Sequence, residues 1–178
     1  MLTATYAILN LSVEQEHARR LISKIQQFCR HCSAGLKDIN LRDLKSVANQ
    51  LTQFDESGHR RKVEQHVIPA IRDATREAAP LLDELASLNA QDESLLTSLK
   101  ALLSLSSDQW MQKLKELNCL MELYCQILLT KLEKEDALFA LAQRLVPSEV
   151  WFRIGTQFLS LDAQNHPHKQ SGDAMQTA

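Results

Sequence analysis

Residues 107–139 read SDQWMQKLKELNCLMELYCQILLTKLEKEDALF, and this stretch decides the fold class. Its apolar residues recur every three or four positions; the series is Trp110, Leu114, Leu117, Met121, Tyr124, Leu128, Leu132 and Phe139. This spacing puts them on one face of a long α-helix, because an α-helix turns once in about 3.6 residues. We expect the helix to begin near Ser107, with Ser106 or Ser107 as its N-cap.

The same helical spacing continues through most of the chain on the N-terminal side of this stretch. A first helix is predicted to start at the N-cap Ser12, where Gln15 completes a capping box, and to end before Gly35. A second helix is predicted from Leu41 to a stop before Pro69, since proline is poorly tolerated inside a helix.

A third helical region is predicted from Ala70, with a turn or bend at Pro80 and a break at residues 89–92. Pro147 is expected to open a last short helix. Residues 162–178 are polar and are predicted to form a disordered tail that follows a single domain, 1–161. The sequence therefore predicts an all-α fold, an antiparallel up-down four-helix bundle with a short extra C-terminal helix.

Composition excludes several classes of function. The 178 residues include only four Gly and four Pro, and the formal net charge is −2 with Lys and Arg spread along the chain. The chain has no cluster of basic residues of the kind that binds nucleic acid, so we do not expect nucleic-acid binding. It also has no phosphate-binding glycine loop and no Gly-x-Ser-x-Gly motif, so we expect neither nucleotide binding of the usual kind nor catalysis by a serine nucleophile. No apolar run approaches the roughly 20 residues that span a bilayer, and the N-terminus has no signal-peptide pattern, so a cytoplasmic protein is expected.

The four cysteines are expected to be thiols in that reducing compartment. Cys29 and Cys32 have the spacing of a zinc or redox half-site, but no second such pair and no βαβ pattern accompanies them. We expect Cys29 to be a thiol at the edge of the core, and Cys119 and Cys125 to be small core residues.

A faint internal repeat points to a metal site. Residues 59–71, HRRKVEQHVIPAI, align without gaps with residues 130–142, TKLEKEDALFALA. Glu64 and Glu135 stand at equivalent positions, each four residues before an apolar residue, while His59 in the first copy is matched by Thr130 in the second. Histidine and carboxylate side chains on facing helices can hold a metal inside a bundle.

Three further stretches belong to this pattern: residues 11–22, LSVEQEHARRLI, with His17; residues 67–71, VIPAI; and residues 133–139, EKEDALF, which Trp151 follows. Together with the repeat, they resemble the hemerythrin-like (HHE cation-binding) family. The resemblance implies an iron-binding four-helix bundle, in which His17, His59, Glu64 and Glu135 fit ligand positions. The chain departs from the family in having no Glu-His pair in residues 71–78, Thr130 in place of a histidine, and Val63 where an acidic residue is usual.

The sequence also allows a second set of metal ligands. Glu14-x-x-His17 and Glu56-x-x-His59 both have the spacing that puts two donors on one helix face. Two such pairs plus one glutamate from each remaining helix form the ligand set of ferritin-like di-iron and di-manganese bundles. Glu135 would supply one single glutamate, and Glu77 or Glu84 the other.

Three functional hypotheses follow. The first is an iron-binding bundle with a reduced or vestigial site, which would hold one or two iron ions. Such a site would bind a diatomic ligand and sense oxygen, nitric oxide, redox state or iron. It would not act as an enzyme. The second is a metal-free helical module that binds a protein partner or a second copy of itself. The third is a ferritin-like di-iron oxidase that uses the two Glu-x-x-His pairs. Each histidine also has a structural interpretation, as a helix residue bonded to a neighbouring carboxylate.

Overall fold

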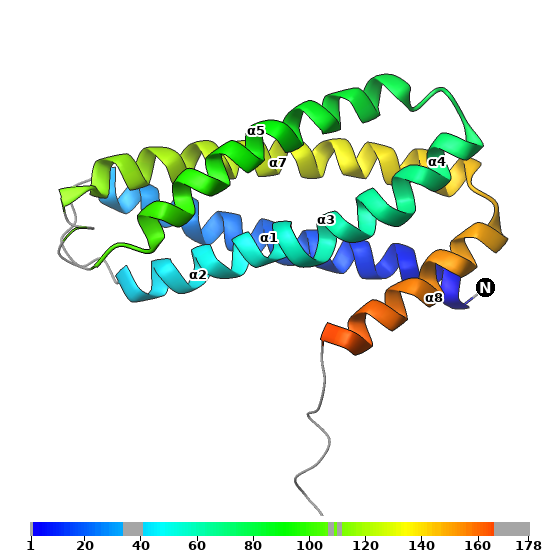
Figure 1. Cartoon of the computed structure of the whole chain (residues 1–178), viewed down its shortest axis with the longest axis horizontal. Helices are drawn as coiled ribbons and strands as arrows, with labels where there is room; N and C mark the ends of the chain where they lie inside the picture. The colour runs from blue at the N-terminus through cyan, green and yellow to red at the C-terminus, as the bar shows by residue number, and fades with distance from the viewer. Residues whose placement is uncertain (1, 34–40, 107–108, 110–111, 166–178) are drawn as a thin grey trace, which may run out of the picture.

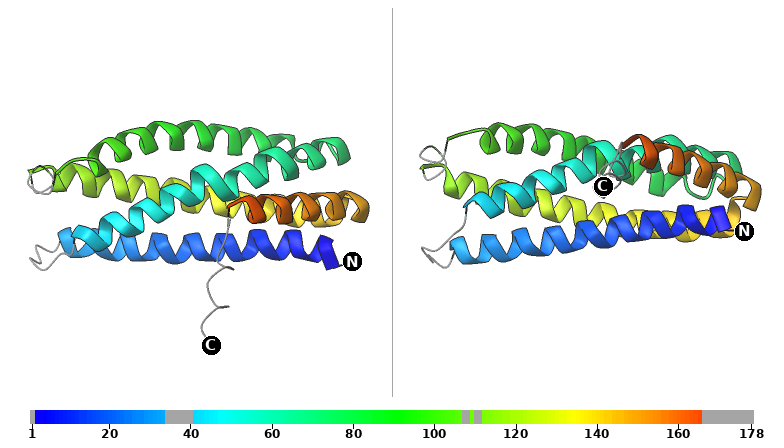
Figure 2. Two further views of the ribbon diagram at one scale, coloured as in Figure 1. Left: turned by 60° about the horizontal axis from the view of Figure 1, so that its bottom comes forward. Right: turned by 90° about the horizontal axis from the view of Figure 1, so that it is seen from below.

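The computed structural model describes residues 2–33, 41–106, 109 and 112–165. These residues form α-helices and two short π-helical turns, and no strand occurs among them. Four long helical stretches lie side by side with alternating directions, and a further helix folds back along the first (Figures 1 and 2). The predicted all-α fold with antiparallel helix packing is therefore confirmed.

Helix α1 (Leu2–Ser33) begins before the predicted N-cap. The Ser12 hydroxyl donates to the Ile8 carbonyl at 3.0 Å, which is a bond within the helix and not a cap. The prediction that the helix starts at Ser12 is wrong, because residues 2–11 carry Ala7 and Leu11, which are buried and continue the same apolar face. The predicted stop, Gly35, lies outside the described residues.

The second segment runs without a break from residue 41 to residue 74. It comprises α2 (Leu41–Gln53), the π-helical turn η1 (Phe54–Gly58), α3 (His59–Lys62), the π-helical turn η2 (Val63–Val67) and α4 (Ile68–Ala74). The predicted stop before Pro69 is wrong. The Ile68 amide bonds to the Val63 carbonyl, five residues back, and Pro69 stands in the first turn of α4, where its missing N–H is tolerated.

Helix α5 (Ala79–Leu103) starts one residue before Pro80 and continues through the predicted break at residues 89–92. The third helical region thus begins nine residues later than Ala70, and the break does not exist. Asn89 and Asp92 look like loop residues in the sequence, but both make polar contacts with neighbouring helices, described below. These contacts favour polar residues at positions that remain helical.

Helix α7 (Leu114–Leu145) is the long helix predicted from residues 107–139, but it begins after Lys113, so the predicted start near Ser107 is seven residues too early. Ser107 and Trp110 lie outside the described residues. Helix α8 (Ser148–Asn165) starts directly after Pro147, as predicted, and packs along α1. It includes residues 162–165, which the sequence placed in the tail; residues 166–178 are outside the described part of the chain. No helix in the described ranges is long and apolar enough to cross a membrane.

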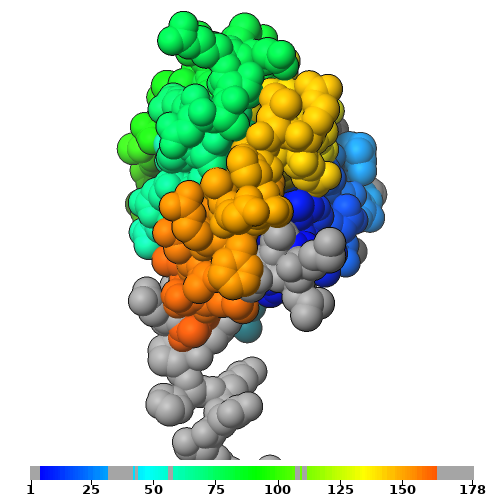
Figure 3. All heavy atoms as spheres, turned by 90° about the vertical axis from the view of Figure 1, so that its right-hand side faces the viewer, coloured from blue at the N-terminus to red at the C-terminus, as the bar shows by residue number. Residues whose placement is uncertain are grey.

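The buried apolar side chains form two clusters along the bundle. One is built from residues 18–29 of α1, 44–51 of α2, 96–103 of α5 and 117–132 of α7. The other contains the beginning of α1, residues 63–71 of the second segment, the start of α5, the end of α7 and the buried face of α8. Figure 3 shows the end of the molecule where α8, in orange, lies next to the first turns of α1, in blue.

Candidate functional site

A layer of buried polar side chains separates the two apolar clusters. Its members, which we call the polar layer, are all at most 3% exposed and come from every long segment of the bundle: Gln15, Asp55, His59, Asp92, Lys131 and Glu135. Buried ionisable groups are rare in proteins unless they are paired. The polar layer is therefore the most distinctive chemical feature of the described chain.

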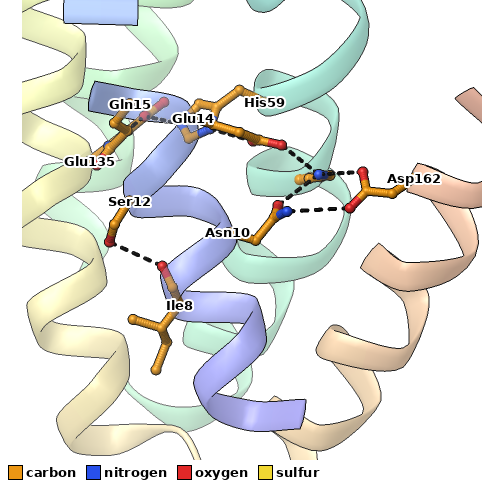
Figure 4. A network of polar contacts seen from close by, with 9 residues as sticks. Ile8, Asn10, Ser12, Glu14, Gln15, His59, Glu135 and Asp162 are labelled. Carbon is orange, nitrogen blue, oxygen red and sulfur yellow. Dashed lines mark hydrogen bonds and ion pairs between the residues drawn. The ribbon is translucent and has the colours of Figure 1, made fainter. Parts of the chain in front are cut away.

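His59 connects three segments through both of its ring nitrogens. Its Nε2 lies 2.7 Å from Glu135 Oε2 on α7, and its Nδ1 lies 3.0 Å from Glu14 Oε2 on α1. The Gln15 amide donates to the same Glu135 oxygen at 3.1 Å. The ring also stacks on Phe54, with the centroids 4.9 Å apart. Figure 4 shows His59, Glu14, Gln15 and Glu135 between the helices.

The two carboxylates fix the charge of His59. Burial alone would lower the pKa of this imidazole, but Glu135, and then Glu14, raise it to about 9. Both ring nitrogens donate when the ring is protonated, which matches the carboxylate on each side. In turn, although burial acts in the opposite direction, the His59 charge holds the pKa of Glu135 below its usual value. His59 and Glu135 thus form a buried ion pair at neutral pH.

Lys131 forms the second charged group of the polar layer. Its ammonium donates to Asp55 Oδ1 at 2.5 Å and to Asp92 Oδ2 at 3.3 Å, so it joins α7 to η1 and to α5. The two aspartates therefore lie against the same ammonium, and one oxygen of each has no hydrogen-bond partner. Burial and the neighbouring Asp55 raise the pKa of Asp92 to about 8, whereas contacts with Asp92 and Lys131 overcome burial and lower the pKa of Asp55.

These protonation states make the polar layer electrically neutral. At pH 7 the two cations, Lys131 and His59, balance the two carboxylates that remain ionised, Asp55 and Glu135, while Asp92 keeps its proton. A buried group of charges is tolerated when each charge is paired and hydrogen-bonded. The charges of this layer are therefore balanced by the protein's own side chains.

A second polar group continues from Glu14 towards the C-terminal helix. The buried Lys62 ammonium donates to Glu14 Oε1 at 2.5 Å, to Asn10 Oδ1 at 2.7 Å and to Asp162 Oδ1 at 2.8 Å. Asp162 also accepts from the Tyr6 hydroxyl at 2.9 Å (Figure 4 shows Asp162 reaching this group from α8). Asp162, in the predicted tail, therefore attaches α8 to α1 and α3.

The structure brings together three of the six residues proposed as metal ligands: His59, Glu135 and Glu14. It does not bring His17 to them, because His17 lies on the exposed side of α1. Glu64 is exposed as well, and its carboxylate accepts hydrogen bonds from Arg60 at 2.9 Å and Asn89 at 2.8 Å. The side chain of Glu56 lies outside the described residues.

The additional glutamates suggested for a ferritin-like site lie on the surface. Glu77 is paired with Arg144 at 3.7 Å, and Glu84 is paired with Lys134. Because both side chains are exposed and His17 also faces outwards, the ferritin-like ligand set does not converge inside this bundle.

The described cysteines are free thiols. Cys29 and Cys125 are buried, as predicted, and burial raises the pKa of Cys125 to about 12. Cys119 is exposed, so the prediction that it belongs to the core is wrong. It lies two positions from the buried Leu117 and Met121, and residues two apart on a helix point to different sides.

The residues present do not fit a di-iron centre. Such a centre needs several imidazole and carboxylate donors around an open position, whereas the polar layer contains one imidazole and both of its nitrogens face carboxylates. Among the described residues, no group of three or more His, Cys, Asp and Glu side chains is arranged to hold a metal ion. The Lys131 ammonium lies between the two aspartates, where it supplies positive charge itself.

Four members of the polar layer were not predicted as site residues, although the sequence carries a signal for them: Gln15, Asp55, Asp92 and Lys131. In each helix they occupy a place in the buried series: Leu11-Gln15-Ala18 in α1, Leu51-Asp55-His59 in the second segment, Leu85-Asp92-Leu96 in α5 and Leu128-Lys131-Glu135 in α7. A polar residue where the three-to-four spacing requires an apolar one indicates a buried polar contact. His17 is two positions from Gln15, and therefore off that face.

Comparisons with protein-family models, with curated proteins and with solved structures find no match to this chain.

Proposed function

We propose that this chain is a hemerythrin-like bundle whose interior site is vestigial, and that it works as a metal-free protein-interaction module. The observation that supports the proposal is the charge balance of the polar layer. Lys131 and His59 neutralise Asp55 and Glu135 from inside the fold, at the level where the resemblance would put a metal. A metal ion added there would meet two cations and would have to displace them.

The outer surface supplies the binding face in this proposal. Helix α1 exposes Leu9 and Val13, which are 59% and 58% exposed, and α8 exposes Phe152 and Leu159, which are 53% and 46% exposed. Spacings of four and seven residues put each pair on one face of its helix. Since α1 and α8 pack against each other, we propose that these residues contact the apolar face of a partner helix, from another protein or from a second copy.

Elemental analysis tests the vestigial site. The protein, purified without a metal-affinity tag, is loaded with Fe²⁺ under reducing conditions, desalted and analysed for iron, and its melting temperature is compared with that of the unloaded protein. We expect no stoichiometric iron and an unchanged melting temperature, because a ligand that binds the folded state would raise it. One or two irons per chain with a raised melting temperature would contradict the proposal.

Light scattering and partner capture test the interaction face. We expect a Val13→Glu, Phe152→Glu double variant to lose self-association, or binding to a captured partner, while its helical content stays unchanged. Leu123→Glu is the matched control, because Leu123 is an exposed apolar residue, 44% exposed, on α7. Equal loss in the control, or none in either variant, would argue against the α1–α8 face.

Iron binding is the second candidate, and one observation favours it. His59 lies within hydrogen-bonding distance of Glu14 and of Glu135, which come from two other segments. The three side chains are not arranged around a metal in this structure, so a mononuclear site would require them to rearrange around a deprotonated His59. This site would bind a diatomic molecule and act as a sensor. If iron is found, His59→Ala should abolish its binding, and His17→Ala, on the exposed side of α1, should leave it unchanged.

A further inference from the structure

Asp55 and Asp92 form an unusual pair of buried acids. Their side chains are 1% and 0% exposed, and they share the Lys131 ammonium. The oxygens that do not contact Lys131, Asp55 Oδ2 and Asp92 Oδ1, have no conventional donor among the described residues. Two buried carboxylates that share one ammonium disfavour the state in which both are ionised, so we infer that one of them carries a proton.

The surroundings decide which acid holds the proton. Lys131 is closer to Asp55, at 2.5 Å against 3.3 Å for Asp92, and the Arg60 charge also acts on Asp55. Asp55 is therefore the ionised member of the pair. Asp92, which is more weakly paired and fully buried, is the protonated member.

The pair joins α5 to the second segment across a polar seam. Two further contacts cross the seam nearby: Arg60 Nη2 donates to Glu93 Oε1 at 2.5 Å, and Asn89 donates to Glu64 at 2.8 Å. An open groove lies along it, lined by Arg60, Glu64, Glu93, Leu96, Thr97 and Lys100, among others. The groove reaches Glu93, the neighbour of Asp92 in the chain, while Asp92 itself is buried behind it.

We propose that the Asp55–Asp92 pair is a one-proton switch that controls how firmly α5 is held against the second segment. With the proton bound, the pair and Lys131 carry no net charge. Without it, two carboxylates face each other in the interior and only one ammonium serves both. The ionised Asp92 carboxylate is then stabilised when it turns towards the groove, where water solvates it. As a result, α5 separates from η1 while it stays packed on α7. The proposal does not depend on the proposed function.

Other titratable groups lie around the pair, and their titration must be distinguished from that of Asp92. They are His59 and Arg60 on α3, Lys131 and Glu135 on α7, and Glu93 beside Asp92 on α5. Arg60 and Lys131 have a raised pKa and keep their charge, and Glu135 has a lowered pKa and keeps its own. His59, with a pKa of about 9, titrates close to Asp92, whose pKa is about 8.

Carbon-13 NMR of the aspartate carboxyl groups in the unmodified protein tests the proton site directly. We expect one buried aspartate, Asp92, to titrate near pH 8, while Asp55 stays ionised down to acidic pH. Hydrogen exchange, corrected for its intrinsic pH dependence, should show that α5 loses protection relative to α7 over the same titration. An Asp92 that titrates below about pH 5, near the ordinary range for aspartate, would overturn the proposal, and so would parallel changes in α5 and α7.

Asp92→Asn provides the matched variant, because an amide has the shape of the protonated acid and is uncharged like it, but cannot lose a proton. Between the usual aspartate pKa of 3.8 and about 8, the ratio of the unfolding constants of wild type and variant should rise up to about 10-fold per pH unit. Asp83→Asn, on an exposed position of α5, should leave this ratio constant. If the ratio for Asp92→Asn is also constant, Asp92 holds no proton in the folded protein.

Discussion

At the scale of single residues, the interior of this protein depends on which partner each buried charge has. Lys131 and His59 each contact two acidic side chains from different segments, so each cation links three parts of the bundle. Removing one partner of a buried ion pair costs much more than removing a surface pair, because the remaining charge has no water around it.

Lys131→Met tests this difference. It keeps a side chain of similar length but leaves Asp55 ionised and unpaired in the interior, so we expect a loss of about 3–5 kcal/mol in the free energy of unfolding. Lys134→Met, which removes a more exposed ion pair one turn away, should cost at most about 1 kcal/mol. Urea denaturation at pH 7 measures both. Similar losses would mean that Lys131 does not stabilise the aspartates.

At the scale of helices, the two π-helical turns lie on either side of the four residues of α3, which carry His59 and Lys62. Each turn widens the helix by one residue, and such turns are frequent at functional sites. Gly58 ends the first turn, next to His59. Since the same segment supplies Asp55 as well, its irregular winding positions two residues of the polar layer and the Lys62 contact with Asp162 on α8.

Gly58→Ala tests whether this turn requires glycine. A methyl group at Gly58 would have no atom within 4 Å, so the structure has room for it. We expect a gain of about 0.5–1 kcal/mol in the free energy of unfolding, since alanine restricts the unfolded chain. The His59 ring resonances in NMR should stay in place. A clear destabilisation would show that the turn needs the backbone freedom of glycine.

Asp162→Ala tests the attachment of α8. The change removes the acceptor for Tyr6 and Lys62, and the buried ammonium keeps only Asn10 and Glu14. We expect faster hydrogen exchange in residues 155–165 and a loss of about 1–3 kcal/mol, while the exchange of α5 is unchanged. Asp136→Ala, which removes an exposed pair with Arg19, is the control. Unchanged exchange in α8 would show that its apolar face alone holds it.

At the scale of the whole molecule, the polar layer should limit stability at both ends of the pH range. Asp55 and Glu135 have lowered pKa values, so the stability they contribute is lost as the pH falls through them. His59 has a pKa raised to about 9 from 6.5, so its contribution is complete below 6.5 and lost on the way to 9. The pKa of Asp92 is raised to about 8 from 3.8, so Asp92 also stabilises the folded state less as the pH rises between these values.

These opposite signs predict a stability maximum at roughly pH 4–5, close to the ordinary carboxyl pKa values. Urea midpoints measured across the pH range should fall on both sides of it, more steeply above pH 7, where His59 and Asp92 act together. His59→Gln should flatten the alkaline side, and His17→Gln, on the exposed side of α1, should follow the wild type. A maximum above pH 8 would contradict the assigned charges.

The sequence by itself determined the helices and the direction in which they pack. Three-to-four spacing of apolar residues, scarce glycine and Pro147 were enough to predict an all-α chain, the long α7 and the start of α8, because these features act locally. The same local rules misplaced the start of α1, the stop at Pro69 and the break at residues 89–92. At those places buried neighbours and tertiary hydrogen bonds override propensity.

Only the tertiary structure decided which polar residues share the interior. His59, Glu135 and Glu14 were named from sequence and do come together, but His17 and Glu64 do not, and Lys131, Asp55 and Asp92 were found only in the fold. Motif spacing gives the distance between residues along one helix, whereas a site depends on how several helices are rotated about their axes. That rotation is set by the packing of two apolar clusters on either side of the polar layer, and it brought a lysine between two aspartates.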